Sequence, residues 1–372
     1  MPELKKILII SDAWHPQING VVRTYEHVIE ELEKKGHEIK VIGPRDFKRT
    51  MPMPGYSEIQ LVLWPYNQIR RMIDAYAPDG IHIATEGPLG WAGRKYCIKH
   101  NTPYTTAYHT HFPDYMAERA GKYIKAFKRP AKAFGIWFTR KFHSTSSAML
   151  VATQSLAHDL ENWQFKTPRY NFSRGVNYDI FYPDGEINPI HHHLQSPVAV
   201  YVGRIAIEKN LRAFLDMPWD GDKLIVGDGP DRPRLESRYK DAHFVGAHKG
   251  TDLAAYYRCG DVFVFPSKTD TFGMVLIEAM ACGRAVACSS ATALPEVVGA
   301  AAILFDPESI EQQTRAIRDI LIDPELGKIS LSSSFCVVVL PEPFAPVSTT
   351  RDSGSERVSS RNKVLVPKWW LT

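Results

Sequence analysis

Short apolar runs alternate with helix-like segments along this chain, and the alternation occurs twice, on either side of a polar stretch. The first series of runs is ILII (7–10), IKVIG (39–43), GIHIA (80–84), PYTTAYH (103–109) and AMLVAT (148–153). The second series is VAVYVG (198–203), KLIVG (223–227), AHFVG (242–246), DVFVF (261–265) and RAVAC (284–288). Such runs are typical of strands covered on both faces, as in parallel sheets with crossover helices. The sequence therefore predicts an α/β protein with two doubly wound, Rossmann-like domains and a cleft between them.

The length also favours two domains, because 372 residues exceed what one hydrophobic core ordinarily organises. We expect an N-terminal domain over residues 1–181, a linker over 182–197 and a C-terminal domain over 198–327. The linker is rich in proline and polar residues and contains three consecutive histidines at 191–193. Adjacent side chains rarely converge on one ion, so a solvated linker is favoured over a metal site. Residues 328–372 are rich in Ser, Val and Pro without a helical period, which predicts an atypical tail that is disordered or non-native.

Composition argues against several classes of protein. The five cysteines are odd in number, irregularly spaced and without a CxxC pair, which disfavours a disulfide framework or a zinc site and favours a reduced, cytoplasmic setting. The N-terminal apolar run ends at Asp12, as expected of a buried strand rather than a signal peptide, and no run is long enough to span a membrane. A net charge of +4 does not by itself make the whole molecule a nucleic-acid binder.

Cations and glycines follow two strands of the second series. Arg204 follows the run at 198–203, Lys209 comes five residues later, and Gly229 belongs to a GDGP turn after the run at 223–227. Ligands of parallel sheets bind beyond the carboxyl ends of the strands, where a guanidinium fork and an ammonium group suit a diphosphate. Two solvated surface charges and an ordinary tight turn remain the alternative.

Two acids flank a glycine turn in SKTDTFGMVLIEAMACG (267–283). Asp270 lies in the loop after a strand, and Glu278 lies in the helix-like segment that follows. Free backbone N–H groups at Gly273 and Met274 would face an anion. Glu278 is surrounded by apolar residues and needs a partner, which sugar or ribose hydroxyls would provide. The alternative is a charge at a helix N-terminus together with one buried glutamate.

In the first series, the loop after the first strand brings Gly20 to the start of a predicted helix. Glycine lets a ligand approach the backbone closely, and a helix N-terminus favours an anion, although a simple strand-to-helix turn is also possible. Neither GxGxxG nor the P-loop pattern is present, which disfavours a Rossmann oxidoreductase. His109 follows another strand, beside His111, and this placement favours a role in a site over the usual structural role of a single histidine.

Residues 119–143 hold eight Lys or Arg, no acid and several large aromatic side chains. Basic residues mixed with large aromatics suit the surface of an anionic membrane. The residues that we expect to contact membrane or acceptor are Lys122, Lys125, Lys128, Arg129 and Trp137. A core-packing pair of helices with a solvated basic face is the alternative. Nucleic acid could use the same residues, but the chain has no fold signature of a nucleic-acid-binding protein, so no such partner is expected.

Taken together, these motifs resemble those of glycosyltransferase family 4, retaining enzymes of the GT-B fold, over roughly residues 5–325. DTFGMVLIE (270–278) is similar to the family's E-x7-E motif, and RIAIEK (204–209) to its R-x4-K diphosphate clamp. TEGPLGWAGRKYC (85–97) and YTTAYHTHFPDYMAER (104–119) read like the branch of bacterial GDP-mannose-dependent α-mannosyltransferases and glycolipid or sulfolipid synthases. The chain departs from the family pattern at Asp270, where Glu is usual, and at Asn177, where Asp is usual.

The resemblance implies roles for the candidate residues. Arg204 and Lys209 would neutralise the donor diphosphate, Glu278 would bind the ribose, and Asp270 would face the transferred sugar, with His109 lining the sugar site from the other domain. The other residues expected at the donor are Gly20, Gly229, Phe272, Gly273 and Met274.

The implied activity is retaining transfer of a hexose from a nucleotide-sugar, GDP-mannose or a UDP-hexose, to a membrane lipid such as diacylglycerol or a phosphoinositide. No cofactor and no metal are expected, because the nucleotide-sugar is a substrate and no acidic pair of the DxD type stands in a donor loop. The expected location is cytoplasmic, peripheral on the inner face of the membrane. The alternatives are transfer to a soluble or oligosaccharide acceptor, and a non-catalytic protein that binds a sugar-nucleotide.

Overall fold

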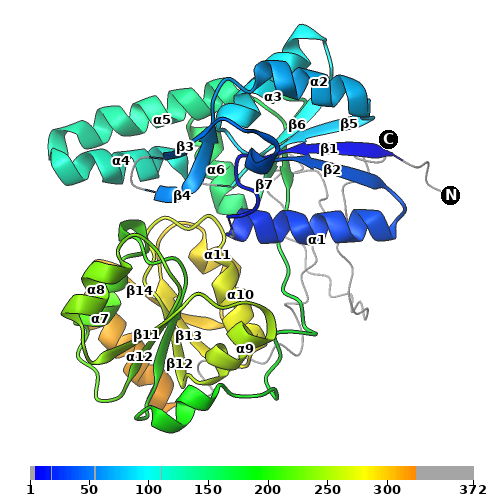
Figure 1. Ribbon diagram of the computed structural model, residues 1–372. Helices are drawn as coiled ribbons and strands as arrows, with labels where there is room; N and C mark the ends of the chain where they lie inside the picture. Colours follow the sequence, from blue (N-terminus) through cyan, green and yellow to red (C-terminus); the bar gives the residue numbers. More distant parts are fainter. Residues whose placement is uncertain (1–4, 18, 54–55, 110, 324–372) are drawn as a thin grey trace, which may run out of the picture. The chain divides into compact units, whose positions relative to one another are not determined.

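The computed structural model describes residues 5–17, 19–53, 56–109 and 111–323, which divide into two compact units (Figure 1). Unit 1 comprises the described residues up to Arg174, and unit 2 begins at Gly175. Residues 182–197, expected to form a linker, lie within unit 2, where Ile190 and Leu194 pack against the core. The expected tail, 328–372, lies outside the described residues.

Unit 1 is built on a parallel six-stranded sheet in the order β2-β1-β5-β6-β7-β8. The strands are β1 (Lys6–Ile10), β2 (Glu38–Ile42), β5 (Gly80–Ile83), β6 (Tyr104–Tyr108), β7 (Ala148–Val151) and β8 (Arg169–Asn171). The helices are α1 (Gly20–Lys34), α2 (Tyr66–Tyr76), α3 (Pro88–Lys99), α4 (Phe112–Tyr123), α5 (Lys128–His143) and α6 (Gln154–Asn162). An antiparallel hairpin of β3 (Thr50–Met53) and β4 (Tyr56–Val62) lies between β2 and α2 in the chain.

Helix α1 shows how local sequence determines an element of unit 1. The side chain of Asn19 accepts hydrogen bonds from the amides of Val21 and Val22, which caps the helix N-terminus. Val22, Val28 and Leu32 recur at helical spacing, and all three are buried. The Asn19 cap therefore sets the start of the helix, and the apolar stripe buries one of its faces.

Unit 2 is a second parallel six-stranded sheet, in the order β11-β10-β9-β12-β13-β14. The strands are β9 (Ala199–Val202), β10 (Lys223–Val226), β11 (Ala242–Gly246), β12 (Val262–Phe265), β13 (Ala285–Ser289) and β14 (Ala302–Phe305). The helices are α7 (Leu211–Asp216), α8 (Arg232–Arg238), α9 (Gly250–Arg258), α10 (Met274–Ala281), α11 (Leu294–Val298) and α12 (Ile310–Ile322). The strand order reverses between β9 and β12, which is where doubly wound sheets place a ligand.

The central strands of unit 2 are buried on both faces, as their continuous apolar sequences predict. Phe263 and Phe265 of β12 are 0% and 2% exposed, and the ring of Phe265 stacks on Tyr201 of β9 at a centroid distance of 6.0 Å. The predicted doubly wound α/β architecture is confirmed for each unit. Strands β8 and β14, at the sheet edges, were not predicted, because both are short and neither is buried throughout.

Candidate functional site

The loops that follow β9 and β12 meet at the switch point of the unit 2 sheet, and an ion pair joins them. The Lys209 ammonium group lies 2.7 Å from each carboxylate oxygen of Asp270. The two side chains are 19% and 16% exposed, so the pair is only partly screened by solvent. The Lys209 ammonium also lies 5.8 Å from the centroid of the Phe265 ring. Two residues that the sequence assigned to different parts of the donor therefore contact each other directly.

Arg204 begins the same loop, and Tyr201 fixes the backbone at this point. The Tyr201 hydroxyl donates to the carbonyl oxygen of Arg204 at 2.9 Å. Burial, together with the negative charges of Asp270 and Glu208, raises the pKa of the Tyr201 hydroxyl well above 10. Tyr201 therefore remains a protonated donor. It holds the start of the loop that carries Arg204 and Lys209, here called the cationic loop, against the sheet.

The GDGP turn after β10 packs directly beneath the cationic loop. The amide of Ile205 donates to the carbonyl oxygen of Asp228 at 2.9 Å. A β-carbon at Gly227 would lie 1.9 Å from the carbonyl oxygen of Gly203, and one at Gly229 would lie 2.3 Å from that of Ile205. Only glycine permits this approach, so Gly229 supports the cationic loop through its lack of a side chain.

Helix α10 begins at Gly273, which adopts a left-handed conformation with φ of 77°. No side chain caps this helix start in the described part of the chain. The amides of the first turn, from Met274 onward, are therefore placed to face an anion. Thr292 donates a hydrogen bond from its hydroxyl to the Asp270 carbonyl at 2.6 Å, which ties the preceding loop to the segment between β13 and α11, and Phe272 is 6% exposed.

Glu278, on α10, is 3% exposed and has a protein partner that the sequence did not indicate. The Tyr257 hydroxyl, on α9, donates to its Oε2 atom at 2.8 Å. Tyr257 packs against Phe263 at a ring centroid distance of 5.5 Å, so its position is fixed by the core. Twenty-one residues separate Tyr257 from Glu278, and no short motif joins them, which is why only the structure identifies the pair.

In unit 1, His109 lies at the carboxyl end of β6 in a buried chain of hydrogen bonds. Its Nδ1 atom is 3.0 Å from Nη2 of Arg174, and its Nε2 atom is 2.9 Å from the Tyr25 hydroxyl. The same hydroxyl is 2.6 Å from Nε2 of His82, whose Nδ1 lies 2.7 Å from the Thr105 hydroxyl. Arg174 can only donate, so Nδ1 of His109 accepts and Nε2 carries its proton.

Burial determines the protonation state of the two histidines in this chain of hydrogen bonds. It lowers the pKa of His109 well below 6.5, with a further contribution from the charge of Arg174, and it lowers the pKa of His82 to about 3. Both imidazoles are therefore neutral near pH 7, and the hydroxyl of Tyr25 bridges them as acceptor from one and donor to the other.

Gly20, the first residue of α1, has open space around it, since an added β-carbon would meet nothing within 4 Å.

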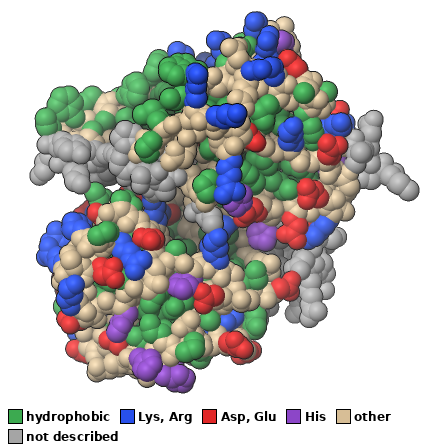
Figure 2. All heavy atoms as spheres, in the orientation of Figure 1, with side chains coloured by type: hydrophobic (Ala, Val, Ile, Leu, Met, Phe, Trp, Pro, Cys, Tyr) green, Lys and Arg blue, Asp and Glu red, His purple; other side chains and the backbone are tan. Residues whose placement is uncertain are grey.

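The predicted membrane-contacting segment forms the end of α4 and the whole of α5. Figure 2 shows hydrophobic side chains gathered over this hairpin. Ile124, Phe127, Phe134 and Trp137 are 53%, 57%, 51% and 47% exposed, which is unusual for large apolar residues so close together.

Charges accompany these apolar side chains. Lys128 and Arg129 are exposed at the start of α5, and Lys141 places its ammonium 5.0 Å from the centroid of the Trp137 ring. The side chains of Lys122 and Lys125 lie outside the described residues.

Neither a metal site nor a membrane span is found in the described residues. No group of three or more His, Cys, Asp or Glu side chains there is arranged to hold a metal ion. Across the same ranges, none of the helices combines the length and the apolar character that crossing a bilayer requires. The expectation of a metal-free reaction stays a prediction.

Two family models match the chain, one in each half. The model described as Glycosyltransferase Family 4 matches residues 18–179, and the model described as Glycosyl transferases group 1 matches residues 196–323. Together they match 290 of the 372 residues.

The chain is also similar to characterised glycosyltransferases. It is 28% identical over 327 residues to a sulfoquinovosyl transferase of Arabidopsis thaliana, covering 83% of this chain and 61% of that protein. It is 28% identical to a GDP-mannose-dependent alpha-mannosyltransferase of Mycobacterium tuberculosis, covering 76% and 78% of the two chains. It is 27% identical to an alpha-monoglucosyldiacylglycerol synthase of Acholeplasma laidlawii, covering 74% and 78%.

Solved structures share the fold. Sucrose-phosphate synthase from Thermosynechococcus elongatus superposes with a TM-score of 0.66 at 20% identity, covering 87% of this chain and 91% of that one. HepE from Anabaena, solved in complex with UDP and glucose, has a TM-score of 0.59 at 13% identity, covering 87% and 92%. These likenesses confirm the predicted GT-B fold.

Proposed function

On the premise that this chain is a glycosyltransferase and belongs to family 4 of these enzymes, we propose that it transfers a hexose from a nucleotide-sugar to a membrane lipid. The observation that carries the proposal is the Lys209–Asp270 ion pair at the switch point of unit 2. It places a cation and an acid, both partly exposed, where a doubly wound sheet binds its ligand. The proposed donors are GDP-mannose and the UDP-hexoses, the mannosyl donor being supported by the names of relatives.

The donor diphosphate would replace Asp270 as the anionic partner of Lys209. Asp270 neutralises the ammonium group, with a carboxylate oxygen 2.7 Å from it. A diphosphate carries more charge, and Arg204 at the start of the same loop adds a fork suited to phosphate oxygens. The released Asp270 carboxylate would then accept hydrogen bonds from the sugar. As the glycosidic bond breaks, both cations would stabilise the charge that develops on the leaving diphosphate, and no metal ion is needed for that purpose.

The nucleoside would be held by Glu278. Its carboxylate is a strong acceptor for vicinal hydroxyls such as those of ribose. Tyr257 donates to Oε2 and so fixes the plane of the carboxylate. The uncapped start of α10, at Gly273 and Met274, would bind a phosphate through backbone amides. The site would thus recognise a sugar, a diphosphate and a ribose with consecutive parts of one loop and helix.

A lipid acceptor is supported by the surface of the α4–α5 hairpin. Aromatic and aliphatic side chains that insert between lipids, with cations that face anionic headgroups, form an interfacial surface rather than a membrane span. Ile124, Phe127, Phe134 and Trp137 supply the apolar part, and Lys128, Arg129 and Lys141 supply charge. Relatives named for diacylglycerol and phosphatidylinositol acceptors support the same class of substrate. Peripheral attachment to the membrane follows from this proposal.

The test is transfer from a panel of nucleotide-sugars to diacylglycerol, phosphatidylinositol and soluble sugars, with identification of the products. We expect a glycolipid product with the configuration of the donor sugar retained, and unchanged activity in EDTA. Products formed only on soluble acceptors would contradict the lipid acceptor, and binding of a donor without any transfer would contradict catalysis.

A further inference from the structure

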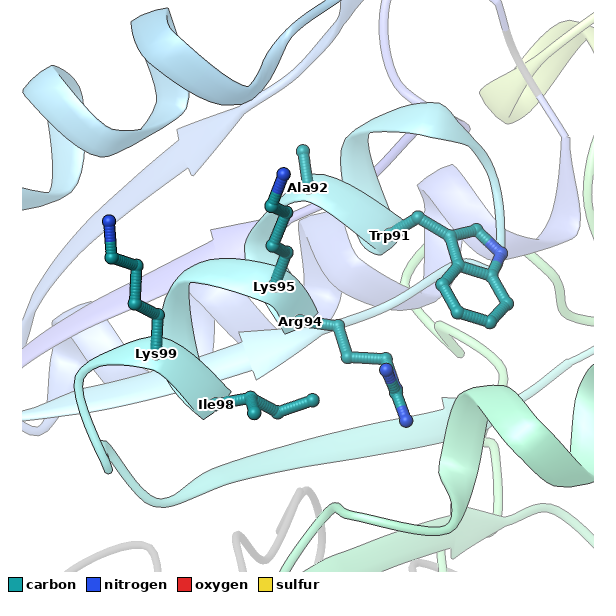
Figure 3. Close-up of a pocket in the computed structure, with 6 residues that line it drawn as sticks. All are labelled: Trp91, Ala92, Arg94, Lys95, Ile98 and Lys99. Atoms are coloured by element: carbon teal, nitrogen blue, oxygen red, sulfur yellow. The ribbon is translucent and has the colours of Figure 1, made fainter.

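The outer face of α3 carries cations and apolar side chains that the proposed sugar transfer does not use. Trp91, Arg94, Lys95, Ile98 and Lys99 stand at spacings of three, four, seven and eight residues from the first, which places them on one broad face of the helix, with Lys95 and Lys99 toward one margin and Arg94 toward the other. They and Ala92 line a shallow groove of about 610 Å³ (Figure 3). Other side chains of α3, such as Leu89 and Tyr96, are buried in the core of unit 1.

The charges of the groove are all positive. In Figure 3, Lys95 and Lys99 rise from one side of α3, whereas Arg94 leaves from the other side, next to Trp91 and Ile98. None of the three cations forms an ion pair with another residue in the described part of the chain. Arg94 donates to the carbonyl oxygens of Phe142 and Lys141 at 2.9 and 3.0 Å, and Lys95 lies 4.6 Å from the centroid of the Tyr66 ring. The groove therefore lacks a counter-charge.

The apolar part of the groove is exposed as well. Ile98 is 44% exposed, and Trp91 packs against Phe138 of α5 with ring centroids 5.3 Å apart. Phe138 in turn contacts Phe134, at 6.2 Å, which belongs to the exposed aromatic surface of α5. The α3 groove is thus continuous with the apolar surface of the α4–α5 hairpin.

The groove is separate from the loops at the carboxyl ends of the unit 1 strands. Helix α3 begins after β5, and its first turn is held there because Asp12 accepts from the amides of Leu89 and Gly90 at 2.8 and 3.2 Å. The groove residues follow this turn, and Lys99 is the last residue of the helix, at the end remote from those loops.

We propose that the α3 groove binds the headgroup of an anionic phospholipid, with its phosphate against Lys95 and Lys99 and its glycerol and first methylenes against Trp91 and Ile98. Uncompensated cations that flank an exposed apolar stripe have the chemistry of an interfacial helix on an anionic leaflet. A soluble anion would use the cations but leave Ile98 exposed to water, whereas a phospholipid covers both. The inference rests on the membrane part of the proposed function and adds a specific lipid class and a second point of attachment.

The test uses the whole protein and vesicles of phosphatidylcholine with or without phosphatidylglycerol. The variant Lys95→Gln/Lys99→Gln removes two exposed charges that make no ion pair, and Lys35→Gln/Lys48→Gln, which removes two other exposed charges outside the groove, is the matched control. At low salt we expect the groove variant to lose roughly 25-fold in partitioning to phosphatidylglycerol vesicles, at about fivefold per cation. We expect a much smaller loss in the control and no change for either variant on phosphatidylcholine.

Further measurements test the apolar contact, distinguish a lipid headgroup from a free phosphate, and distinguish failure of the groove proposal from failure of the proposed function. Ile98→Ser, which removes the exposed apolar side chain, should also weaken binding to phosphatidylglycerol vesicles relative to the wild type, and it should leave thermal stability unchanged. Equal losses in both charge variants, or none in the groove variant, would overturn the inference, as would displacement from vesicles by millimolar glycerol phosphate. Transfer to detergent-dispersed diacylglycerol is measured in parallel. If the wild type transfers sugar but the groove variant binds vesicles as well as the wild type does, only the groove proposal is overturned. If the groove variant loses vesicle binding but the wild type shows no transfer, only the proposed sugar transfer is overturned.

Discussion

The ammonium group of Lys209 lies equidistant from both carboxylate oxygens of Asp270, at 2.7 Å from each. This ion pair links the loop after β9 to the loop after β12, across the point where the strand order of the sheet reverses. Asp270 therefore neutralises the cation for which we propose a role in diphosphate binding. Under that proposal, binding of a donor would exchange one anionic partner of Lys209 for another.

Replacement of Lys209 by alanine should reduce transfer by roughly 100- to 1000-fold, because it removes a charge that stabilises the leaving diphosphate. Steady-state rates with the best donor measure the effect. Lys268→Ala is the matched control, since Lys268, in the loop after β12, pairs with Glu308 at 2.6 Å and has no proposed contact with the donor. A comparable loss in both variants would contradict the assignment to Lys209.

Replacement of Asp270 by asparagine should separate binding from transfer. Lys209 loses its anionic partner, so we expect a nucleoside diphosphate to bind more tightly, by about fivefold for a pair worth roughly 1 kcal/mol. Transfer should fall, because the carboxylate that would face the sugar is gone. Calorimetric titration with GDP and UDP, alongside kinetics, checks both. Weaker diphosphate binding in Asp270→Asn would show that the two anions do not compete.

Tyr257→Phe should lower the free energy of unfolding by about 1–2 kcal/mol, because Glu278 keeps its burial and loses the 2.8 Å hydrogen bond. It should also raise the KM for the donor, since the carboxylate is no longer held in one plane. Phe263→Leu, a core change beside Tyr257, provides the comparison: it should affect stability and leave the KM near that of the wild type. Equal KM values for both variants would remove Tyr257 from the donor site.

Acid should destabilise unit 1 through His82. Its folded pKa of about 3 lies below the 6.5 of the unfolded chain, so the unfolded state binds the proton first as the pH falls. The stability that neutral His82 contributes is complete above pH 6.5 and is lost as the pH falls toward 3. From pH 7.5 to pH 5 the loss is about 2 kcal/mol.

Urea unfolding of wild type and His82→Gln at both pH values isolates this loss. Asp12 titrates in the opposite direction: burial raises its pKa to about 6, so its contribution is present below its unfolded pKa of 3.8 and is lost as the pH rises through 6. Because both proteins contain Asp12, its contribution cancels in the difference. The advantage of wild type over the variant should shrink by about 2 kcal/mol at pH 5; a constant difference would mean that His82 is not buried and neutral.

Sequence alone was sufficient for the features that depend on local pattern. Ten of the strands followed from short apolar runs, and the Arg204, Lys209 and Asp270 loops followed from their positions after those runs. The partners of the site residues did not follow. Tyr257 and Tyr25 reach Glu278 and His109 from distant helices, and in sequence both tyrosines are ordinary members of an apolar stripe. The division between the units also differed, because residues 175–197 look polar and yet contribute Val176, Ile180 and Phe181 to the core of unit 2.

The predicted site roles and metal independence remain predictions that the experiments above address. Of the predicted membrane residues, Trp137 is 47% exposed, whereas Phe142 of the same segment is buried against α3, with its ring centroid 5.2 Å from that of Trp91. The helical period alone could not separate these two groups, since aromatic residues stand on every side of the segment.

Gly227→Ala should lower the free energy of unfolding by roughly 3 kcal/mol, because the added methyl group would collide with the carbonyl oxygen of Gly203 at 1.9 Å. Gly80→Ala, where a β-carbon meets nothing within 4 Å, is the control and should be close to neutral. Thermal and urea unfolding of both variants checks this expectation.

The absence of a side chain at Gly227 and Gly229 has a consequence for how mutations in this protein are interpreted. A bulkier residue there would lift the strand-end segment that carries Arg204 and Lys209, and the enzyme would behave as though a charge had been deleted. A screen for loss of function would therefore score these two positions with the cations, although neither has a functional group. Restoring activity would call for removal of bulk and not for addition of charge.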